Sequence, residues 1–241
     1  MHHPQATAAA PTPGLQLERA LTLLEHCGHP APDGLPGSPE WLQSLIDSLV
    51  DLSSRDPLTG LANRRSFELA LAREIDRVAR VGESALLLAI DIDHFKRIND
   101  TYGHAAGDQV IRAISAALAE TVRPMDMVAR VGGEEFAILL PNCPPAFGPH
   151  VAQRLRQRVS RTVVRTDEGP VLTATVSVGG AFAPQWVRSN ARLWMERADR
   201  QLYRAKAEGR DRVCLEPSAE PSVSAEEKGL LFGTSQFQDL E

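Results

Sequence analysis

The feature that most constrains the fold is the segment ALLLAIDID, residues 85–93, a continuous apolar run that ends in two aspartates. A run without polar alternation is typical of a strand that is buried on both faces of a sheet. Such a strand places the chain in a mixed α/β class, in which helices flank a central sheet. Asp91 and Asp93 then stand where this strand ends.

The segment RVGGEEFAILLP, residues 130–141, contains two neighbouring glutamates before another apolar run. We predict strands at 127–131 and 135–140, joined by a hairpin turn at Gly132 and Gly133. Adjacent carboxylates repel each other, and each resists burial unless a cation or a hydrogen-bond donor meets it. One interpretation is therefore a tight hairpin whose glutamates are exposed to solvent.

The other interpretation is a cation site. If the two apolar strands are neighbours, Asp91 and Glu134 converge at one edge of the sheet. Converging carboxylates without an arginine in reach usually hold Mg²⁺, which prefers oxygen ligands and also binds substrate phosphates. Two such ions roughly 3.5–4 Å apart are the standard device for displacement at phosphorus. Gly132 and Gly133 fit this interpretation, because a backbone without side chains lets a nucleotide come close.

The order of the remaining elements predicts one α/β domain over residues 55–215. We expect the segment RDPLTGLANRR to be a turn-rich junction, and residues 94–108 to be a loop that leads into a helix. Apolar spacing and strand-like runs predict the other elements. These are helices through residues 67–78, 110–118, 145–161 and 190–208, and strands at 173–181 and 212–215.

The chain before this domain predicts a helical extension at residues 14–54, after a disordered segment at 1–13. A short helix is expected to end near Gly28, followed by a Pro- and Gly-rich linker at 29–39. The second helix begins with Ser38 as its cap, and its leucines 42, 45, 49 and 52 form a coiled-coil-like seam of under two heptads. This seam fits either packing onto the chain's own domain or a dimer stalk. We expect the acidic residues 216–241 to be a disordered tail.

Composition narrows the function classes. The net charge of −5 argues against nucleic acid as a partner, since phosphate-backbone binders usually have a basic surface. No apolar run approaches the ~20 residues needed to cross a bilayer, and the first residues lack signal-peptide character. The three cysteines are far apart and form no metal-type pair. We therefore expect a cytoplasmic protein with reduced thiols and no membrane insertion.

Five motifs occur in order along the chain: RDPLTGLANRRSF, DIDHFKRINDTYGHAAGD, ARVGGEEFAILLP, VSVGGA and ADRQLYRAKAEGRDRV. Together they resemble the GGDEF family of diguanylate cyclases, in its GGEEF variant, over about residues 51–215. The resemblance implies a fold similar to the palm domain of polymerases and class III nucleotide cyclases, with a central, mostly antiparallel sheet flanked by helices. It also implies a reaction in which two GTP condense into cyclic di-GMP and release two pyrophosphates. Each domain would hold one GTP, so a homodimer would be part of the mechanism.

The resemblance assigns roles at the edge of the sheet. Asp91, the carbonyl of Ile92 and Glu134 would hold Mg²⁺ or Mn²⁺, with two ions in each site. Glu135 would assist with charge or proton handling. The general base stays open between Glu134 and a water molecule.

Further residues match substrate-binding positions of the family. Asn99 and Asp108 match guanine-reading positions, and a carboxylate can accept both N1–H and N2–H₂ of guanine, which adenine lacks. Asp108 also fits an acid at a helix N-terminus. His104 matches a position that lines the base and ribose pocket. Phosphate contacts are matched by Lys96, Lys206 and Arg210, which otherwise suit a solvated surface, and Gly132 and Gly133 would lie beside the nucleotide.

A second site is implied just before the hairpin. Arg123 and Asp126 form the RxxD pattern of the family's inhibitory product site, and Arg154 matches a further contact there. Cyclic di-GMP bound at these residues would inhibit noncompetitively. The predicted extension at residues 14–54 would mediate dimerisation or bind a small cytoplasmic regulatory protein. Two alternatives stay open: a catalytically silent receptor for GTP or cyclic di-GMP, and a cyclase that makes another product, such as cyclic GMP–AMP.

Overall fold

A six-stranded sheet forms the centre of the molecule. In this computed structural model, which describes residues 16–166, 170–183 and 189–217, the strand order is β1-β3-β4-β2-β7-β8. The pairs β3–β4, β4–β2 and β2–β7 are antiparallel, whereas β1–β3 and β7–β8 are parallel. The strands are β1 (Ala62–Asn63), β2 (Leu86–Ile92), β3 (Met127–Arg130), β4 (Glu135–Leu140), β7 (Val176–Phe182) and β8 (Val213–Leu215). The expected mixed α/β fold with a mostly antiparallel central sheet is confirmed.

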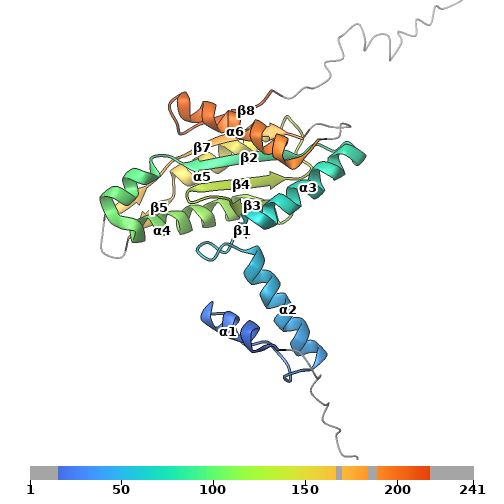
Figure 1. Ribbon diagram of the computed structural model, residues 1–241. Helices are drawn as coiled ribbons and strands as arrows, with labels where there is room; N and C mark the ends of the chain where they lie inside the picture. The colour runs from blue at the N-terminus through green and yellow to red at the C-terminus, as the bar shows by residue number, and fades with distance from the viewer. Residues whose placement is uncertain (1–15, 167–169, 184–188, 218–241) are drawn as a thin grey trace, which may run out of the picture.

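Helices cover both faces of the sheet (Figure 1). On one face, α3 and α6 enclose a core with Phe67 and Trp194, and on the other, α4 and α5 enclose one with Phe136 and Ile114. All seven residues of β2 are buried, as the apolar run predicts. Each fully buried Leu or Ile there contributes about 1.5–3 kcal/mol of transfer free energy. The helices are α3 (Arg64–Val81), α4 (Phe95–Thr121), α5 (Gly148–Ser160) and α6 (Ala191–Ala207).

The expected loop at residues 94–108 is wrong, because α4 already begins at Phe95. Phe95 is buried in the core and Ile98 packs against it, so tertiary contacts stabilise a turn that has little apolar periodicity of its own. The helix is interrupted at Gly103, whose φ of 81° and ψ of 164° are not helical. This kink redirects the chain before the regular part of the helix.

Three smaller expectations also differ from the structure. The junction RDPLTGLANRR contains the short strand β1, which pairs with β3. The strand expected at 173–181 is divided between β6 (Val171–Thr173), in a hairpin with β5 (Val163–Arg165), and β7 in the main sheet. Helix α5 begins only at Gly148, because Pro149 lacks an N–H and is tolerated in the first turn of a helix but not in its interior.

The two N-terminal helices, α1 (Glu18–His26) and α2 (Pro39–Ser54), form a pair of their own beside the domain (Figure 1). Ser38 caps α2, its hydroxyl accepting the N–H of Trp41 at 3.2 Å. Leu24 of α1 is buried against Trp41 and Leu45 of α2. Leu42, Leu45 and Leu49 of the α2 seam therefore pack with α1 rather than with the chain's own α/β domain. The expectations for residues 1–13 and for most of the tail at 216–241 lie outside the described residues.

Candidate functional site

The carboxylates of the two motifs meet at one edge of the sheet, where β2 ends and β4 begins. In the antiparallel ladders, Asp91 lies opposite Glu135 on β4 and opposite Ser177 on β7. The N–H of Ile92 donates to the carbonyl oxygen of Glu134 at 3.2 Å. The strand register therefore brings together the whole predicted metal set: Asp91, Ile92 and Glu134.

Lys206 of α6 is the cation that meets this cluster. Its Nζ lies 2.6 Å from Asp91 Oδ2, and the Asp91 side chain is only 8% exposed. Burial raises the pKa of Asp91, although Lys206 opposes this effect. Burial and the charge of Asp91 also raise the pKa of Glu134. Two carboxylates thus share one lysine, and the surplus negative charge favours a further cation.

The donor set fits a divalent metal. Within the part of the chain that the structure describes, no three His, Cys, Asp or Glu side chains gather into a metal-binding group. The predicted set needs only two carboxylates and one backbone carbonyl, because Mg²⁺ keeps several waters and binds substrate phosphates. Oxygen donors with raised pKa and surplus negative charge suit this hard cation.

The hairpin turn separates the two glutamates. Glu134 is half-buried beside Asp91, whereas Glu135 is exposed. The carbonyl of Glu135 accepts N–H groups from Val131 and Gly132 at 2.9 and 3.3 Å. A Cβ on Gly132 would collide with the Glu135 carboxylate, so Gly132 makes room for that side chain, while Gly133 faces open space. The exposed-hairpin interpretation therefore describes Glu135 but not Glu134.

Asn99 and Asp108 are brought together across the kink of α4. A Cβ on Gly107 would collide with Asn99 Oδ1, which places the Asn99 side chain directly over the residue before Asp108. Asn99 Oδ1 is buried and has no hydrogen-bond partner among the described residues. Such an atom is costly to leave unpaired, so a donor from a ligand would satisfy it. Gly107 was not predicted as a site residue; the small residues of HAAGD before Asp108 were its only signal.

The remaining predicted contacts lie on surfaces near this edge. Lys96 and His104 are exposed on the first part of α4 and just after its kink. Arg210 follows the end of α6, four residues after Lys206, and has a left-handed φ of 62°. Neither Lys96 nor His104 has an ion pair in the described ranges, so both are available to a ligand.

The three residues predicted for an inhibitory site surround one cavity of about 230 Å³. Arg123 and Asp126 close a tight turn, in which the Arg123 N–H donates to Asp126 Oδ2 at 2.8 Å. Burial raises the pKa of Asp126, and the positive charges of Arg123 and Arg154 oppose that shift. Arg154 reaches over from α5, where it donates to the carbonyl of Thr121 at 3.2 Å. The structure thus brings together two guanidinium groups and a carboxylate beside Cys143 and Phe147.

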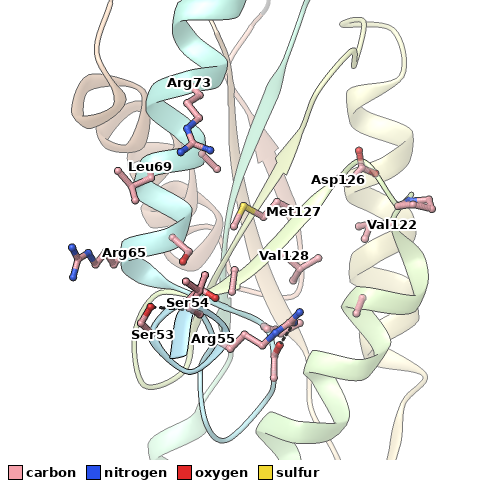
Figure 2. A pocket seen from close by; sticks show the side chains of 18 of the residues that line it. Ser53, Ser54, Arg55, Arg65, Leu69, Arg73, Val122, Asp126, Met127 and Val128 are labelled. Atoms are coloured by element: carbon pink, nitrogen blue, oxygen red, sulfur yellow. Dashed lines mark hydrogen bonds between the residues drawn. The ribbon is translucent and has the colours of Figure 1, made fainter. Parts of the chain in front are cut away.

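A wider groove of about 1040 Å³ lies away from the carboxylates, where α2 meets the domain. Figure 2 shows Arg65, Leu69 and Arg73 of α3 on one side and the end of α2 below. Arg123 and Asp126 also line this groove, so it continues toward the 230 Å³ cavity. The end of α2 and the arginine-lined cavity therefore border a common hollow.

Arg130 connects the hairpin to the segment after α2, and sequence analysis did not single it out. Its guanidinium donates to the carbonyl of Gly133 at 3.1 and 2.8 Å and to Asp56 at 3.2 and 3.3 Å. The Arg130 and Asp56 side chains are only 14% and 17% exposed. Asp56 also accepts the N–H and hydroxyl of Thr59. The turn before Glu134 is therefore tied to residues that follow α2.

Comparison with known proteins identifies this arrangement. Residues 53–212 match the GGDEF family, described as diguanylate cyclase, GGDEF domain. The chain belongs to this family. The match contains both edge carboxylates, the Asn99–Asp108 pair and the turn of Arg123 and Asp126. The GGDEF domain therefore carries all the predicted site residues.

Three relatives are similar to this chain over the GGDEF domain. Probable diguanylate cyclase DgcC of Escherichia coli K12 is 41% identical over 163 residues, 67% of this chain and 43% of DgcC. The coiled coil and GGDEF domain of Caulobacter crescentus DgcB, in complex with c-di-GMP, has a TM-score of 0.69 at 30% identity, covering 83% of this chain and all of that one. Diguanylate cyclase SiaD of Pseudomonas aeruginosa, in complex with its activator SiaC, has a TM-score of 0.67 at 33% identity. The match covers 83% of this chain and 72% of the SiaD chain. The chain spans less than half the length of DgcC and of Bacillus subtilis YhcK.

No helix among the described residues of this GGDEF chain combines the length and apolar character needed to span a membrane.

The Arg130 connection predicts a coupled loss of stability. Arg130→Ala and Asp56→Ala should each lower the free energy of unfolding by about 1–3 kcal/mol, because each leaves a partly buried charge without its partner. The double variant should lose clearly less than the sum, since both changes remove the same interaction. Urea unfolding of the four proteins measures this, with Arg64→Ala, an exposed ion-pair residue, as the control. Strictly additive losses would contradict the connection.

Proposed function

We propose that this chain is a diguanylate cyclase, which condenses two GTP into cyclic di-GMP and releases two pyrophosphates. The observation that carries the proposal is the pair of charge-coupled carboxylates, the buried Asp91 and the half-buried Glu134, at the sheet edge of a GGDEF domain. The relatives DgcC and SiaD are described as probable diguanylate cyclase and diguanylate cyclase, which supports the same activity here.

In the proposed reaction, the ribose 3′-hydroxyl of one GTP attacks the α-phosphate of the other. Asp91, Glu134 and the carbonyl of Ile92 would hold Mg²⁺ or Mn²⁺, two ions in each site, which when bound supply charge neutralisation at phosphate and activation of the hydroxyl. Glu134 or a water molecule accepts the hydroxyl proton, and Glu135 assists in charge or proton handling. Gly132 and Gly133 let the nucleotide approach the backbone.

Guanine recognition falls to Asn99 and Asp108. The unpaired Asn99 Oδ1 and the half-buried Asp108 carboxylate are acceptors, which match the N1–H and N2–H₂ donors of guanine. Adenine lacks this donor pair and would leave both acceptors unmatched. His104 borders the base and ribose. Lys96, Lys206 and Arg210 bind the triphosphate, and Lys206 already lies at the carboxylate edge.

The chain works as a homodimer in this proposal, because each domain supplies one GTP. Helix α2 provides the dimer contact, and two of its apolar side chains, Ile46 and Val50, stay 52% and 57% exposed beside the α1 pairing. The regulatory input is a small protein that binds residues 14–54. The SiaD structure, which includes an activator protein, supports a partner of this kind. A silent receptor for GTP or cyclic di-GMP is the alternative function.

The variant Glu134→Gln tests both the proposed activity and the metal assignment. The purified chain, incubated with GTP and Mg²⁺, should yield cyclic di-GMP on chromatography, whereas the variant should lose at least 100-fold in rate. Its melting temperature should not fall, because burial and the charge of Asp91 already disfavour the Glu134 carboxylate. Undiminished turnover by the variant would remove Glu134 from the metal set. A wild type that binds GTP but forms no product, even with cell lysate added, would favour the receptor.

Gly107→Ala tests guanine recognition without touching a polar group. The added methyl group must displace the Asn99 side chain, so affinity for GTP should fall about tenfold or more. Isothermal titration with 3′-deoxy-GTP, which lacks the attacking hydroxyl, measures the affinity. Ala105→Ser, on the exposed neighbouring position, is the control. Equal affinities of both variants and wild type would show that Asn99 does not contact the base.

Product inhibition is proposed at the cavity of Arg123, Asp126 and Arg154, where two guanidinium groups suit guanine and phosphate. Arg123→Ala should weaken inhibition by cyclic di-GMP about 10- to 100-fold while initial turnover of GTP persists. The turn itself should survive, because Asp126 accepts the backbone N–H of residue 123 rather than its side chain. Initial rates at increasing cyclic di-GMP measure the effect, and an unchanged inhibition curve would rule this site out.

A further inference from the structure

Asp93 lies two residues after Asp91, yet its environment is different. It is only 5% exposed, and it forms no ion pair with a lysine, arginine or histidine of the described residues. Its Oδ1 accepts the Ser177 hydroxyl at 2.6 Å, and its Oδ2 accepts the Thr175 hydroxyl at 2.7 Å. Its own N–H donates to the carbonyl of Thr175 at 2.9 Å. Ser177 of β7 and Thr175, the residue just before this strand, thus hold the carboxylate in one orientation.

The third donor to Asp93 comes from a distant turn. The backbone N–H of Asp211 donates to Asp93 Oδ2 at 3.0 Å. Asp211 belongs to the turn between α6 and β8, in which Gly209, Arg210 and Asp211 have φ values of 117°, 62° and 45°. Two consecutive non-glycine residues with left-handed backbone are unusual, and they persist only where the surroundings hold them.

Two more contacts hold the same turn. The N–H of Arg210 donates to the carbonyl of Ala205 at 3.0 Å, and this bond connects Arg210 to the last turn of α6. Arg156 of α5 lies 2.6 Å from the Asp211 carboxylate and also donates to its carbonyl oxygen at 3.4 Å. Asp93 is a buried side-chain anchor of this turn, and it connects the turn directly to the end of β2. The backbone position of Arg210 therefore depends on a carboxylate beside the metal-binding edge.

We propose that Asp93 is a positioning residue for triphosphate binding, which holds Arg210 in the left-handed turn where it meets the terminal phosphates. The inference rests on the proposed function, because the phosphate contact of Arg210 belongs to it. Asp93 itself contacts neither phosphate nor metal. Its two oxygens are already taken by three donors, and its role is to accept the Asp211 N–H while Thr175 and Ser177 fix its orientation.

The positioning role predicts which nucleotides are affected. Arg210 acts on the terminal phosphates, so loss of its position should weaken binding of a triphosphate but not of GMP. A general disturbance of the fold would weaken both. Asp93→Asn retains one acceptor oxygen, which can still meet the Asp211 N–H, and the Ser177 hydroxyl can rotate to accept from the amide group. This variant should therefore restore most of what Asp93→Ala loses.

A double-mutant cycle tests the inference. With the full chain, affinities for 3′-deoxy-GTP and for GMP are measured in wild type, Arg210→Ala, Asp93→Ala and the double variant. We expect about a tenfold loss for 3′-deoxy-GTP in each single variant, no change for GMP, and no further loss in the double variant. Glu74→Gln, which alters a buried carboxylate toward the far end of α3, should change neither affinity.

The outcomes distinguish the phosphate contact of Arg210 from the positioning role of Asp93. If Arg210→Ala leaves 3′-deoxy-GTP binding unchanged, the proposed phosphate contact is wrong, and the positioning role fails with it. If Arg210→Ala weakens binding but Asp93→Ala does not, or if the two losses add, the positioning role alone is overturned. If Asp93→Ala does not fold, the double variant Thr175→Val/Ser177→Ala replaces it, because it removes the two hydroxyl groups that fix the orientation of Asp93. Unchanged 3′-deoxy-GTP binding in that variant overturns the inference.

Discussion

The end of β2 sets the central constraint on this molecule. The strand is buried along all seven residues, and the chain then places two carboxylates, Asp91 and Asp93, at its edge where burial is costly. The two are stabilised in opposite ways. Asp93 receives three hydrogen bonds and is satisfied by the protein. Asp91 has one lysine, and burial raises its pKa against the effect of that lysine. With Glu134 nearby, the cluster retains surplus negative charge. The protein thus satisfies the Asp93 carboxylate fully, whereas the cluster around Asp91 can still accept a further cation.

Close packing of α6 on the sheet places Lys206 at this edge. Gly179 of β7 lies so near that a Cβ would collide with the backbone of Ala198 and Leu202. The missing side chain lets α6 lie directly on the sheet, and Lys206, one turn after Leu202, then reaches Asp91. The same helix ends in the turn that carries Arg210 and is anchored at Asp93. The edge with the carboxylates Asp91 and Glu134 and the turn that carries Arg210 therefore share one helix and one strand end.

Local patterns predicted the parts of the fold that local forces determine. The run at residues 85–93 and the glycine hairpin appear where expected, because continuous apolarity and turn chemistry act over short distances. The first turns of α4 were missed, since Phe95 and Ile98 give little periodicity and only the core stabilises them. The site partners Arg130 and Asp56 are 74 residues apart, and the Asp93–Asp211 contact spans 118. No short-range pattern encodes such pairs. The family motifs located the individual residues, but not the contacts that hold them.

Helix α2 carries two apolar stripes, and α1 covers only one of them. Leu45 is 2% exposed because α1 covers it, so a coiled coil through the same seam would have to displace α1. Ile46 and Val50 stay open and offer a second stripe that α1 does not occupy. At its end, α2 continues through the Asp51–Arg55 ion pair to Asp56, and from there through Arg130 to the carbonyl of Gly133. Two ion pairs, joined by the peptide bond between Arg55 and Asp56, thus connect the end of the helix to the residue before Glu134. The placement of α2 and the conformation of the hairpin are therefore not independent, whichever stripe a partner occupies.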